Sequence, residues 1–519
     1  MARLDQAWSS LLANWSKAVR FLSGKQSGSL SEQAVVLFAG NILALSFGIA
    51  VPIVLVRVFP REAYGLYQQL LLIFTTLQPF GQWGVTQGLY YFLPREPENR
   101  AIFVAQTYLF VLVVGCLCCA GLFMFQHSIA GFMNNPAIAD YIPVLAIYTL
   151  LMTISAFLEA LLIAEGKAHG AAILRIGSEF FRATSLVATA LVTRSIYAMF
   201  FSLTLLALAR CVFQWYYLRK NYQLSLKNVQ FFNLKRQISY SFPIGFANVI
   251  FLMQQKLHNF VVTFLFSPVT YALYSIGSYN LPFLGIITSS VSNIMVPELS
   301  RCQKEGNNER MLTIWQGALR KSNLLLFPSF AFFFVLADTF IVFFFTEQYQ
   351  ASIPIFRVSL FGILLSGANA GAILNAFAAT KYQMKLALFR LPVTLLLVYT
   401  CTITYGIHGA IAANVVAFSF FRFLMIAKAA RVMRLPLKDL ICLSMNGKIM
   451  AAALSAGLAV GTIQYLLQLT LFWTLATSVP IFLVIYCLLA LGLGVLSRKE
   501  IILCCKAVLP GRTVLRKTP

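Results

Sequence analysis

Charged residues are scarce in this chain of 519 residues. They make up 11% of the sequence, while apolar residues make up 59% and the mean hydropathy is +0.79. A soluble chain of this length would be expected to form two or more domains, and this composition excludes that class. The sequence therefore predicts an all-α, polytopic membrane protein, because crossing the hydrocarbon takes roughly 20 apolar residues in a helix.

Motifs of enzymatic chemistry are also missing. The sequence has no GxxxxGK[ST] phosphate loop, so ATP-driven transport by this chain alone is not expected. GxSxG, HExxH and paired outer carboxylates are absent, which leaves a hydrolase or glycosyltransferase without candidate residues. The ten cysteines and four histidines show no metal-ligand spacing. We therefore expect no enzymatic activity, no metal and no cofactor, while a coupling ion, Na⁺ or H⁺, is left open.

Long apolar runs dominate what is present, and fourteen of them are long enough to span a bilayer. They lie at about 34–57, 68–93, 101–125, 141–164, 171–192, 196–218, 238–265, 271–296, 322–345, 353–378, 384–404, 408–427, 448–468 and 472–496. Residues 1–33 precede the first run, and their helically spaced apolar residues predict an interfacial amphipathic helix and a linker. A disordered tail is the alternative for this segment.

Acidic residues are few, 16 against 40 Lys and Arg, and the formal net charge is +24. If the N-terminus is cytoplasmic, the inner segments hold 30 of these cations and the outer loops hold two, Arg61 and Arg194. That asymmetry is the positive-inside pattern, so both termini are predicted to be cytoplasmic and anionic lipids are expected partners. No basic patch interleaved with aromatic residues remains, so no nucleic-acid partner is expected.

The chain repeats itself at a distance of about 207 positions. Asn41, Phe59 and Tyr67, for example, correspond to Asn248, Phe266 and Tyr274. We interpret 34–220 and 237–430 as parallel six-span lobes related by a pseudo-two-fold axis. A basic linker, 221–236, joins them, and two extra spans, 431–496, and a basic tail, 497–519, follow.

The first span of each lobe is rich in residues that let a helix bend. These residues are Asn41, Gly48 and Pro52 in one lobe and Pro243, Gly245 and Asn248 in the other. Close helix packing explains them as well as a conformational hinge does, so both interpretations stay open.

Eight cations remain at membrane depth after the inner and outer ones are subtracted (40 − 30 − 2), and burying them in lipid would be costly. They are Arg57, Arg175, Arg182, Arg210, Lys256, Arg357, Arg390 and Arg422. Glu159, Glu179 and Asp338 are the acids at that depth, and the spacing places Glu179 on one helix face with Arg175 and Arg182. We expect a water-accessible cationic cavity that binds a membrane-held anion, with Arg182, Glu159 and Glu179 in charge pairing or ion coupling. Snorkelling of the arginines to lipid head groups is the alternative.

Several motifs resemble those of a known family. They are FPREAYGLYQ at Phe59–Gln68, FLPRE at Phe92–Glu96, FSPVTYALYSIG at Phe266–Gly277, VPELSR at Val296–Arg301 and YGIHGAIAANV at Tyr405–Val415. The ordered set resembles the Wzx-type polysaccharide or lipid-linked oligosaccharide flippases of the multidrug/oligosaccharidyl-lipid/polysaccharide exporter superfamily.

The resemblance implies two six-helix lobes plus two added helices, an arrangement shared with the multidrug exporters, in the inner membrane. It also implies alternating-access transfer of an undecaprenyl-pyrophosphate-linked glycan, such as an O-antigen or exopolysaccharide repeat unit, to the outer leaflet. A polysaccharide polymerase and a chain-length regulator are candidate partners. The alternatives are a cation-coupled multidrug exporter of the same superfamily and a non-transporting scaffold for polysaccharide assembly.

Overall fold

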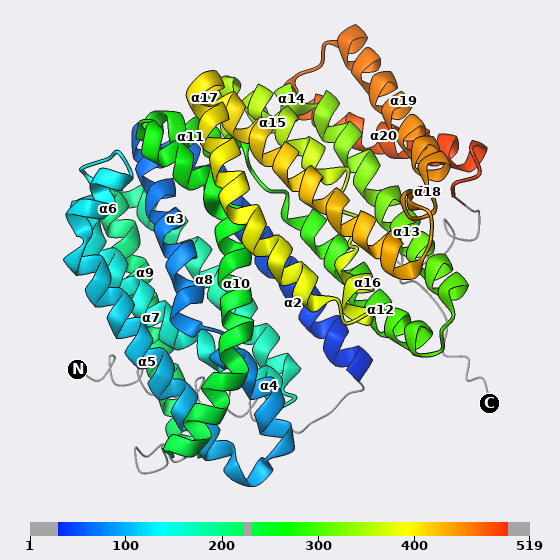
Figure 1. Cartoon of the computed structure of the whole chain (residues 1–519). Helices are drawn as coiled ribbons and strands as arrows, with labels where there is room; N and C mark the ends of the chain where they lie inside the picture. The colour runs from blue at the N-terminus through cyan, green and yellow to red at the C-terminus, as the bar shows by residue number, and fades with distance from the viewer. Residues whose placement is uncertain (1–29, 223–229, 497–519) are drawn as a thin grey trace, which may run out of the picture. The chain divides into compact units, whose positions relative to one another are not determined.

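The computed structural model describes residues 30–222 and 230–496, and helices make up most of both ranges (Figure 1). Neither range contains a strand, which confirms the all-α class. The predicted amphipathic helix before residue 30, the basic tail after residue 496 and residues 223–229 of the linker lie outside the described residues.

The chain divides into two compact units by its internal contacts. The first unit holds the residues up to Ser275 and Leu391–Ala410, and the second holds Ile276–Arg390 and the residues from Ile411 onward. The predicted lobes, 34–220 and 237–430, were defined by sequence repetition, which is a different criterion, and their boundaries stay a prediction.

The helices up to the unit boundary follow one another with short connections. They are α2 (Leu30–Val58), α3 (Arg61–Gln82), α4 (Val85–Arg95), η1 (Pro97–Asn99), α5 (Arg100–Met124), α6 (Gln126–Phe132), α7 (Ile138–Ala164), α8 (Ala168–Thr193), α9 (Ile196–Tyr222), α10 (Phe231–Leu265) and α11 (Pro268–Gly277). In Figure 1, α5, α7 and α9 run side by side, and α7 contacts both neighbours as well as α3.

The remaining helices are more often interrupted. They are α12 (Pro282–Lys304), α13 (Asn308–Val335), α14 (Ala337–Phe345), η3 (Glu347–Ser352), α15 (Ile353–Leu360), η4 (Phe361–Ile363), α16 (Gly371–Ala376), α17 (Thr380–Met433), α18 (Leu437–Ile441), α19 (Leu443–Leu467) and α20 (Leu471–Gly492).

Seven helical segments among the described residues are long and apolar enough to cross a membrane. They are Pro97–Met124, Ile138–Ala164, Ile196–Tyr222, Asn308–Val335, Thr380–Met433, Leu437–Leu467 and Leu471–Gly492. The fifth of these is 54 residues long and contains two predicted spans, 384–404 and 408–427. Gly406 breaks the helix between them, with φ 62° and ψ −149°. Only glycine adopts this backbone conformation without strain.

The second predicted span of each lobe, 68–93 and 271–296, is broken in the middle. The first break lies between α3 and α4, where Trp83 and Gly84 have φ of 39° and 71°. The second break is the non-helical stretch 278–281 between α11 and α12. Non-helical backbone at membrane depth has to be covered by protein, because lipid cannot satisfy its hydrogen bonds.

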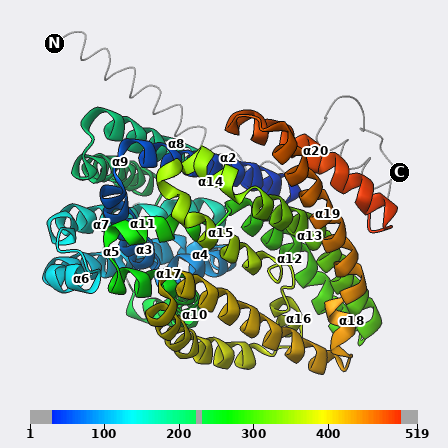
Figure 2. The same ribbon diagram turned by 90° about the horizontal axis from the view of Figure 1, so that it is seen from above.

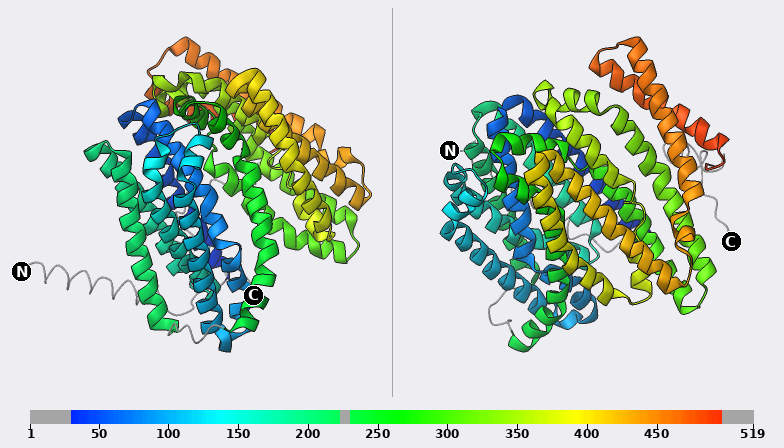
Figure 3. Two further views of the ribbon diagram at one scale, coloured as in Figure 1. Left: turned by 60° about the vertical axis from the view of Figure 1, so that its left-hand side comes forward. Right: turned by 45° about the horizontal axis from the view of Figure 1, so that its top comes forward.

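Helix α10 covers the first of these breaks. The backbones of Gly84 and Gly245 meet there, and a Cβ on Gly84 would lie 2.7 Å from the Gly245 nitrogen. Trp83 stacks on Phe242 with ring centroids 5.3 Å apart, and Gln237 donates a hydrogen bond of 2.6 Å to Thr107 on α5. Figure 3 shows α10, in green, running beside α3 and α4, in blue.

The core of the first unit lies among α4, α5, α7 and α9. Leu89, Phe92, Phe103, Phe157 and Tyr217 are all buried within it. Phe92 stacks on Phe103 at 4.8 Å between ring centroids. These contacts connect α4 and α5 with α7 and α9, which lie further along the chain.

The core of the second unit joins α12, α13, α16 and the end of α17. Trp315 is buried in it, and its indole nitrogen donates a hydrogen bond of 2.9 Å to the Leu440 carbonyl of α18. Helix α19 lies along α13, with α20 beside it (Figure 2). Gly457 allows that approach, since a Cβ there would lie 3.2 Å from Val335. The two extra spans therefore pack on the second unit.

The predicted hinge residues lie in continuous helices. Pro52 is inside α2 and Pro243 is inside α10, with no helix end at either position. Asn41 and Gly48 are half-buried on α2, and Asn248 is exposed on α10. Gly245 makes a tight backbone contact, so packing accounts for its size, and the hinge role stays a prediction for the set.

Gly245→Ala should destabilise the protein. A Cβ at this position would lie 2.2 Å from the Trp83 carbonyl oxygen, so α10 would have to move away from backbone. We expect a cost of about 1–3 kcal/mol, which is usual for overpacking, measured as a lower Tm of the purified protein in detergent. Gly121→Ala on α5 is the control, because a Cβ there meets nothing within 4 Å. Equal Tm values for the two variants would contradict the tight crossing.

Candidate functional site

Charged side chains at membrane depth gather in the first unit where α7, α8 and α9 meet. Arg175 of α8 donates a hydrogen bond of 3.1 Å to Glu159 of α7. Arg182 holds one carboxylate oxygen of Glu179 with two nitrogens, at 2.9 and 2.6 Å. Both arginines of α8 are therefore paired with an acid.

The sequence prediction for this cluster is correct for one arginine and incomplete for the other. Arg182 contacts Glu179 three residues away, as the helix spacing predicts. Arg175 was placed on the same face as Glu179, but it pairs with Glu159 on the neighbouring helix. The physical reason is that Arg182 already engages Glu179 and that packing of α8 against α7 brings a second carboxylate within reach.

Arg210 on α9 belongs to the same cluster. It interacts electrostatically with Glu159 and Glu179, as well as with the Tyr148 side chain. The cluster therefore contains three arginines, at 175, 182 and 210, and two glutamates, so its net charge is +1 with all groups ionised. We name it the α7–α9 cluster.

The arginines of the second unit are held differently. Arg422 of α17 donates from Nε to the Leu365 carbonyl at 3.2 Å and from Nη2 to the Ser366 carbonyl at 3.0 Å. A longer contact of 3.5 Å joins its Nη1 to the Asn369 side-chain oxygen. All these acceptors are neutral, and they lie between η4 and α16, where the backbone leaves the α-helical path. Arg422 is therefore hydrogen-bonded while its charge is not neutralised.

Arg390 lies close to Arg422, and no acid of the described ranges lies beside it. The two guanidinium groups interact electrostatically and share one aromatic ring. The Phe418 centroid is 5.7 Å from Cζ of Arg390 and 5.5 Å from Cζ of Arg422. The buried Nε of Arg390 has no hydrogen-bond partner, and neither arginine forms an ion pair within residues 30–222 and 230–496. We name Arg390 and Arg422 the arginine pair.

The other predicted cations lie apart from both groups. Arg357 pairs with Asp338 at 2.5 Å and also donates to the Phe334 carbonyl at 3.3 Å. Arg57 donates to the Ile53 carbonyl of its own helix at 2.5 Å. Lys256 is half-buried on α10 and forms no ion pair with the described part of the chain. Their role in substrate binding stays a prediction.

Two features of the arginine pair were missed from the sequence. Phe418 precedes Arg422 by four residues on α17, a spacing that places both on one helix face and could have identified it. Asn369 and the two carbonyls lie in a stretch that the sequence presents as an unbroken apolar run, 353–378, and no signal identified them.

Among the described residues, no three or more His, Cys, Asp or Glu side chains are grouped so that they could hold a metal ion. The described charge-bearing groups are mostly guanidinium and carboxylate. Such an arrangement can bind an anion or carry a proton on a glutamate.

The sequence matches a known family. Residues 54–354 match the family described as polysaccharide biosynthesis protein, which is more than half of the chain. The chain belongs to the polysaccharide biosynthesis protein family. This confirms the polysaccharide side of the resemblance that the motifs suggested. A sequence search of curated proteins found no significant match.

Solved structures share the fold of this polysaccharide biosynthesis protein at low sequence identity. The lipid II flippase MurJ, in an inward closed conformation, matches with a TM-score of 0.70 and 14% identity over 88% of this chain and 98% of its own. An inward-facing multidrug resistance MATE family transporter of the MOP superfamily matches with a TM-score of 0.64 and 14% identity over 76% and 98%. A MOP superfamily transporter from Pyrococcus furiosus matches with a TM-score of 0.57 and 14% identity over 80% and 98%. These matches establish the fold of a multi-pass membrane protein.

Glu179 and Arg182 should be energetically coupled. Replacing either residue with glutamine leaves one charge without its partner at membrane depth, so the single variants should together cost more than the double variant. We expect a coupling energy of about 1–2 kcal/mol, within the range for contacting residues, from unfolding of the four proteins in a double-mutant cycle.

The pair Glu298 and Arg301 is the matched control. It has the same spacing and an N–O distance of 2.7 Å, but its side chains are 42% and 54% exposed. Exposed pairs contribute about 0–1 kcal/mol. If the coupling energy of Glu179 and Arg182 is as small as that of the control pair, the surroundings of the α8 pair do not strengthen its interaction.

Proposed function

We propose that this protein transfers an undecaprenyl-pyrophosphate-linked oligosaccharide, such as an O-antigen or exopolysaccharide repeat unit, from the inner to the outer leaflet by alternating access. Membership of the polysaccharide biosynthesis protein family supports a lipid-linked glycan as the substrate. The single observation that carries the proposal is the arginine pair, two cations at predicted membrane depth with no acid beside them among the described residues.

The chemistry of a pyrophosphate suits this pair. Guanidinium groups present several N–H donors in a plane and bind phosphate oxygens with charge-assisted hydrogen bonds. The buried Nε of Arg390 has no acceptor in the part of the chain that the structure describes, and an unsatisfied buried donor costs about 1–3 kcal/mol. A phosphate oxygen at this nitrogen would remove that cost, whereas a cationic drug would add a third positive charge. We therefore favour the flippase over a multidrug exporter or a scaffold.

The α7–α9 cluster takes a different role in this proposal. Its arginines are already paired or face glutamates, so they attract an anion more weakly than the arginine pair does. Protonation of Glu159 or Glu179, or exchange of Na⁺ there, would raise or lower the cluster's net charge. We propose these two glutamates as the groups that couple an ion to transport.

The orientation in the membrane follows from the Lys and Arg distribution. Thirty of the 40 cations lie on one side in the predicted topology, which favours cytoplasmic termini in an inner-membrane protein. Anionic lipids would face those segments, and a polysaccharide polymerase and a chain-length regulator would receive the transferred repeat unit.

Replacing Arg390 and Arg422 together with glutamine should lower transfer at least about tenfold at subsaturating substrate, since a loss of about 1.4 kcal/mol raises the dissociation constant by that factor. The measurement is the rate of lipid-linked oligosaccharide transfer in proteoliposomes. Lipid-linked repeat units should also accumulate on the cytoplasmic leaflet of a deletion strain that carries the variant. Normal surface polysaccharide without accumulation would overturn the assignment.

The matched control replaces Arg431 and Arg434, two exposed arginines at the end of the same helix, with glutamine. This control removes the same charge from the same unit and should transfer at the wild-type rate. An equal loss in both double variants would indicate a general charge effect and not a binding site.

A further inference from the structure

A hollow on the second unit lies apart from the arginine pair. It is formed by α13, α18 and the first turns of α19, and its volume is about 530 Å³. We name it the α18–α19 hollow, and its polar lining consists of Gln316, Lys438, Asp439, Cys442, Ser444 and Lys448. The volume lies within the range of small-ligand pockets, roughly 300–1,000 Å³.

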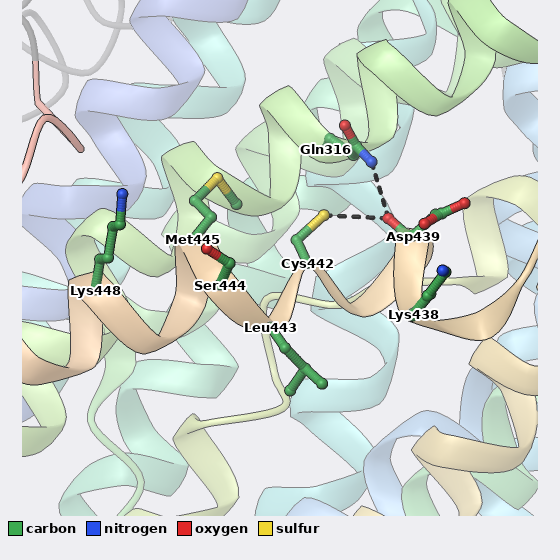
Figure 4. A pocket seen from close by; sticks show the side chains of 8 residues that line it. All are labelled: Gln316, Lys438, Asp439, Cys442, Leu443, Ser444, Met445 and Lys448. Carbon is green, nitrogen blue, oxygen red and sulfur yellow. Dashed lines mark hydrogen bonds between the residues drawn. The ribbon is translucent and has the colours of Figure 1, made fainter.

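The walls of this hollow are fixed by hydrogen bonds. Gln316 of α13 donates to the Asp439 carbonyl at 2.9 Å, and the Cys442 thiol donates to the same oxygen at 3.2 Å. Trp315 holds the next carbonyl, that of Leu440, at 2.9 Å. Figure 4 shows the first two bonds converging on one oxygen. The hollow is therefore a built feature of the second unit.

The lining is cationic. Lys448 stands at one end of the labelled side chains in Figure 4, and Lys438 stands near the other end, next to Asp439. Neither lysine forms an ion pair with the described residues. The Asp439 carboxylate points away from Gln316 and Cys442 in that view. The Ser444 hydroxyl adds a further donor. Two unpaired ammonium groups and a hydroxyl favour a phosphate ester as the ligand.

The hollow lies where a membrane-spanning helix begins. The candidate span Leu437–Leu467 includes it, and the uncharged stretch of α19 begins directly after Lys448. Lysines at the end of a spanning helix lie at head-group level. Leu443, Leu454 and Leu458 are exposed along α19 at helical spacing, by 69%, 40% and 68%. An acyl chain can therefore extend along the helix from a head group in the hollow.

We propose that the α18–α19 hollow binds the head group of an anionic glycerophospholipid. Lys438 and Lys448 contact its phosphate and glycerol oxygens with Ser444, while the acyl chains lie on the exposed leucines of α19. The lipid bridges α18 and α19, which α13 already holds, and so stabilises the two extra spans on the second unit. This inference does not rest on the proposed transport function.

The test is the thermal stability of the full-length protein in detergent with added lipid. Phosphatidylglycerol should raise the Tm of the wild type more than phosphatidylcholine does, because a ligand that binds the folded state stabilises it. The double variant Lys438→Gln, Lys448→Gln should lose at least half of that difference. The control Lys381→Gln, Lys385→Gln, at two exposed lysines of α17 outside the hollow, should keep it.

Three results would overturn the proposal. They are a full phosphatidylglycerol shift in the Lys438/Lys448 variant, an equal loss in the control, and a full shift produced by glycerol 3-phosphate alone, which would indicate a soluble phosphate ester. The Tm in phosphatidylcholine reports whether each variant folds. If the double variant does not fold, native mass spectrometry of the single variant Lys448→Gln in phosphatidylglycerol micelles replaces the Tm measurement. It should show one tightly bound lipid fewer than the wild type, and an unchanged number would equally refute the site.

Discussion

The cost of a positive charge at membrane depth is the constraint on which the rest of this structure depends. Each arginine near a helix centre costs about 2.5–3.5 kcal/mol on insertion scales unless the protein compensates it. Arg175, Arg182 and Arg357 are compensated by carboxylates. Arg422 is compensated by backbone carbonyls, and Arg390 has the faces of aromatic rings. Of these partners, only the carboxylates neutralise the charge.

The different solutions follow from the helices around each arginine. In the first unit the fourth predicted span is one unbroken helix, Ile138–Ala164, whose carbonyls bond within the helix, so a side chain, Glu159, has to compensate Arg175. The corresponding tenth span, 353–378, is interrupted between Phe361 and Ala370. Its carbonyls at Leu365 and Ser366 are therefore available to Arg422. The broken span allows the second unit to hold a cation without an acid.

The sequence predicted those parts of the structure that depend on local pattern. Apolar runs lie in each of the seven long apolar helical segments of the described residues, and helix spacing placed Arg182 on one face with Glu179. It did not predict the Arg175–Glu159 pair, because that contact depends on how α7 packs against α8. It also missed the breaks at Trp83–Gly84 and 361–370, since the apolar pattern continues through both while the backbone does not. The unpartnered Nε of Arg390 could not be foreseen, because the surrounding backbone determines which donors are satisfied.

In the proposed function, the two arginines of the pair would contribute differently to the binding of one anion. Arg422 already uses Nε and Nη2 on carbonyls and Nη1 on a side-chain oxygen, so its orientation is fixed and it contributes mainly a positive field. Arg390 retains an unused donor and contributes a directional hydrogen bond. A ring shared by both guanidinium groups keeps the two like charges close without an acid. A carboxylate there would satisfy the donor and cancel the field. The lack of an ion pair at these two arginines among the described residues therefore fits the proposed function, in which an anion binds and is released.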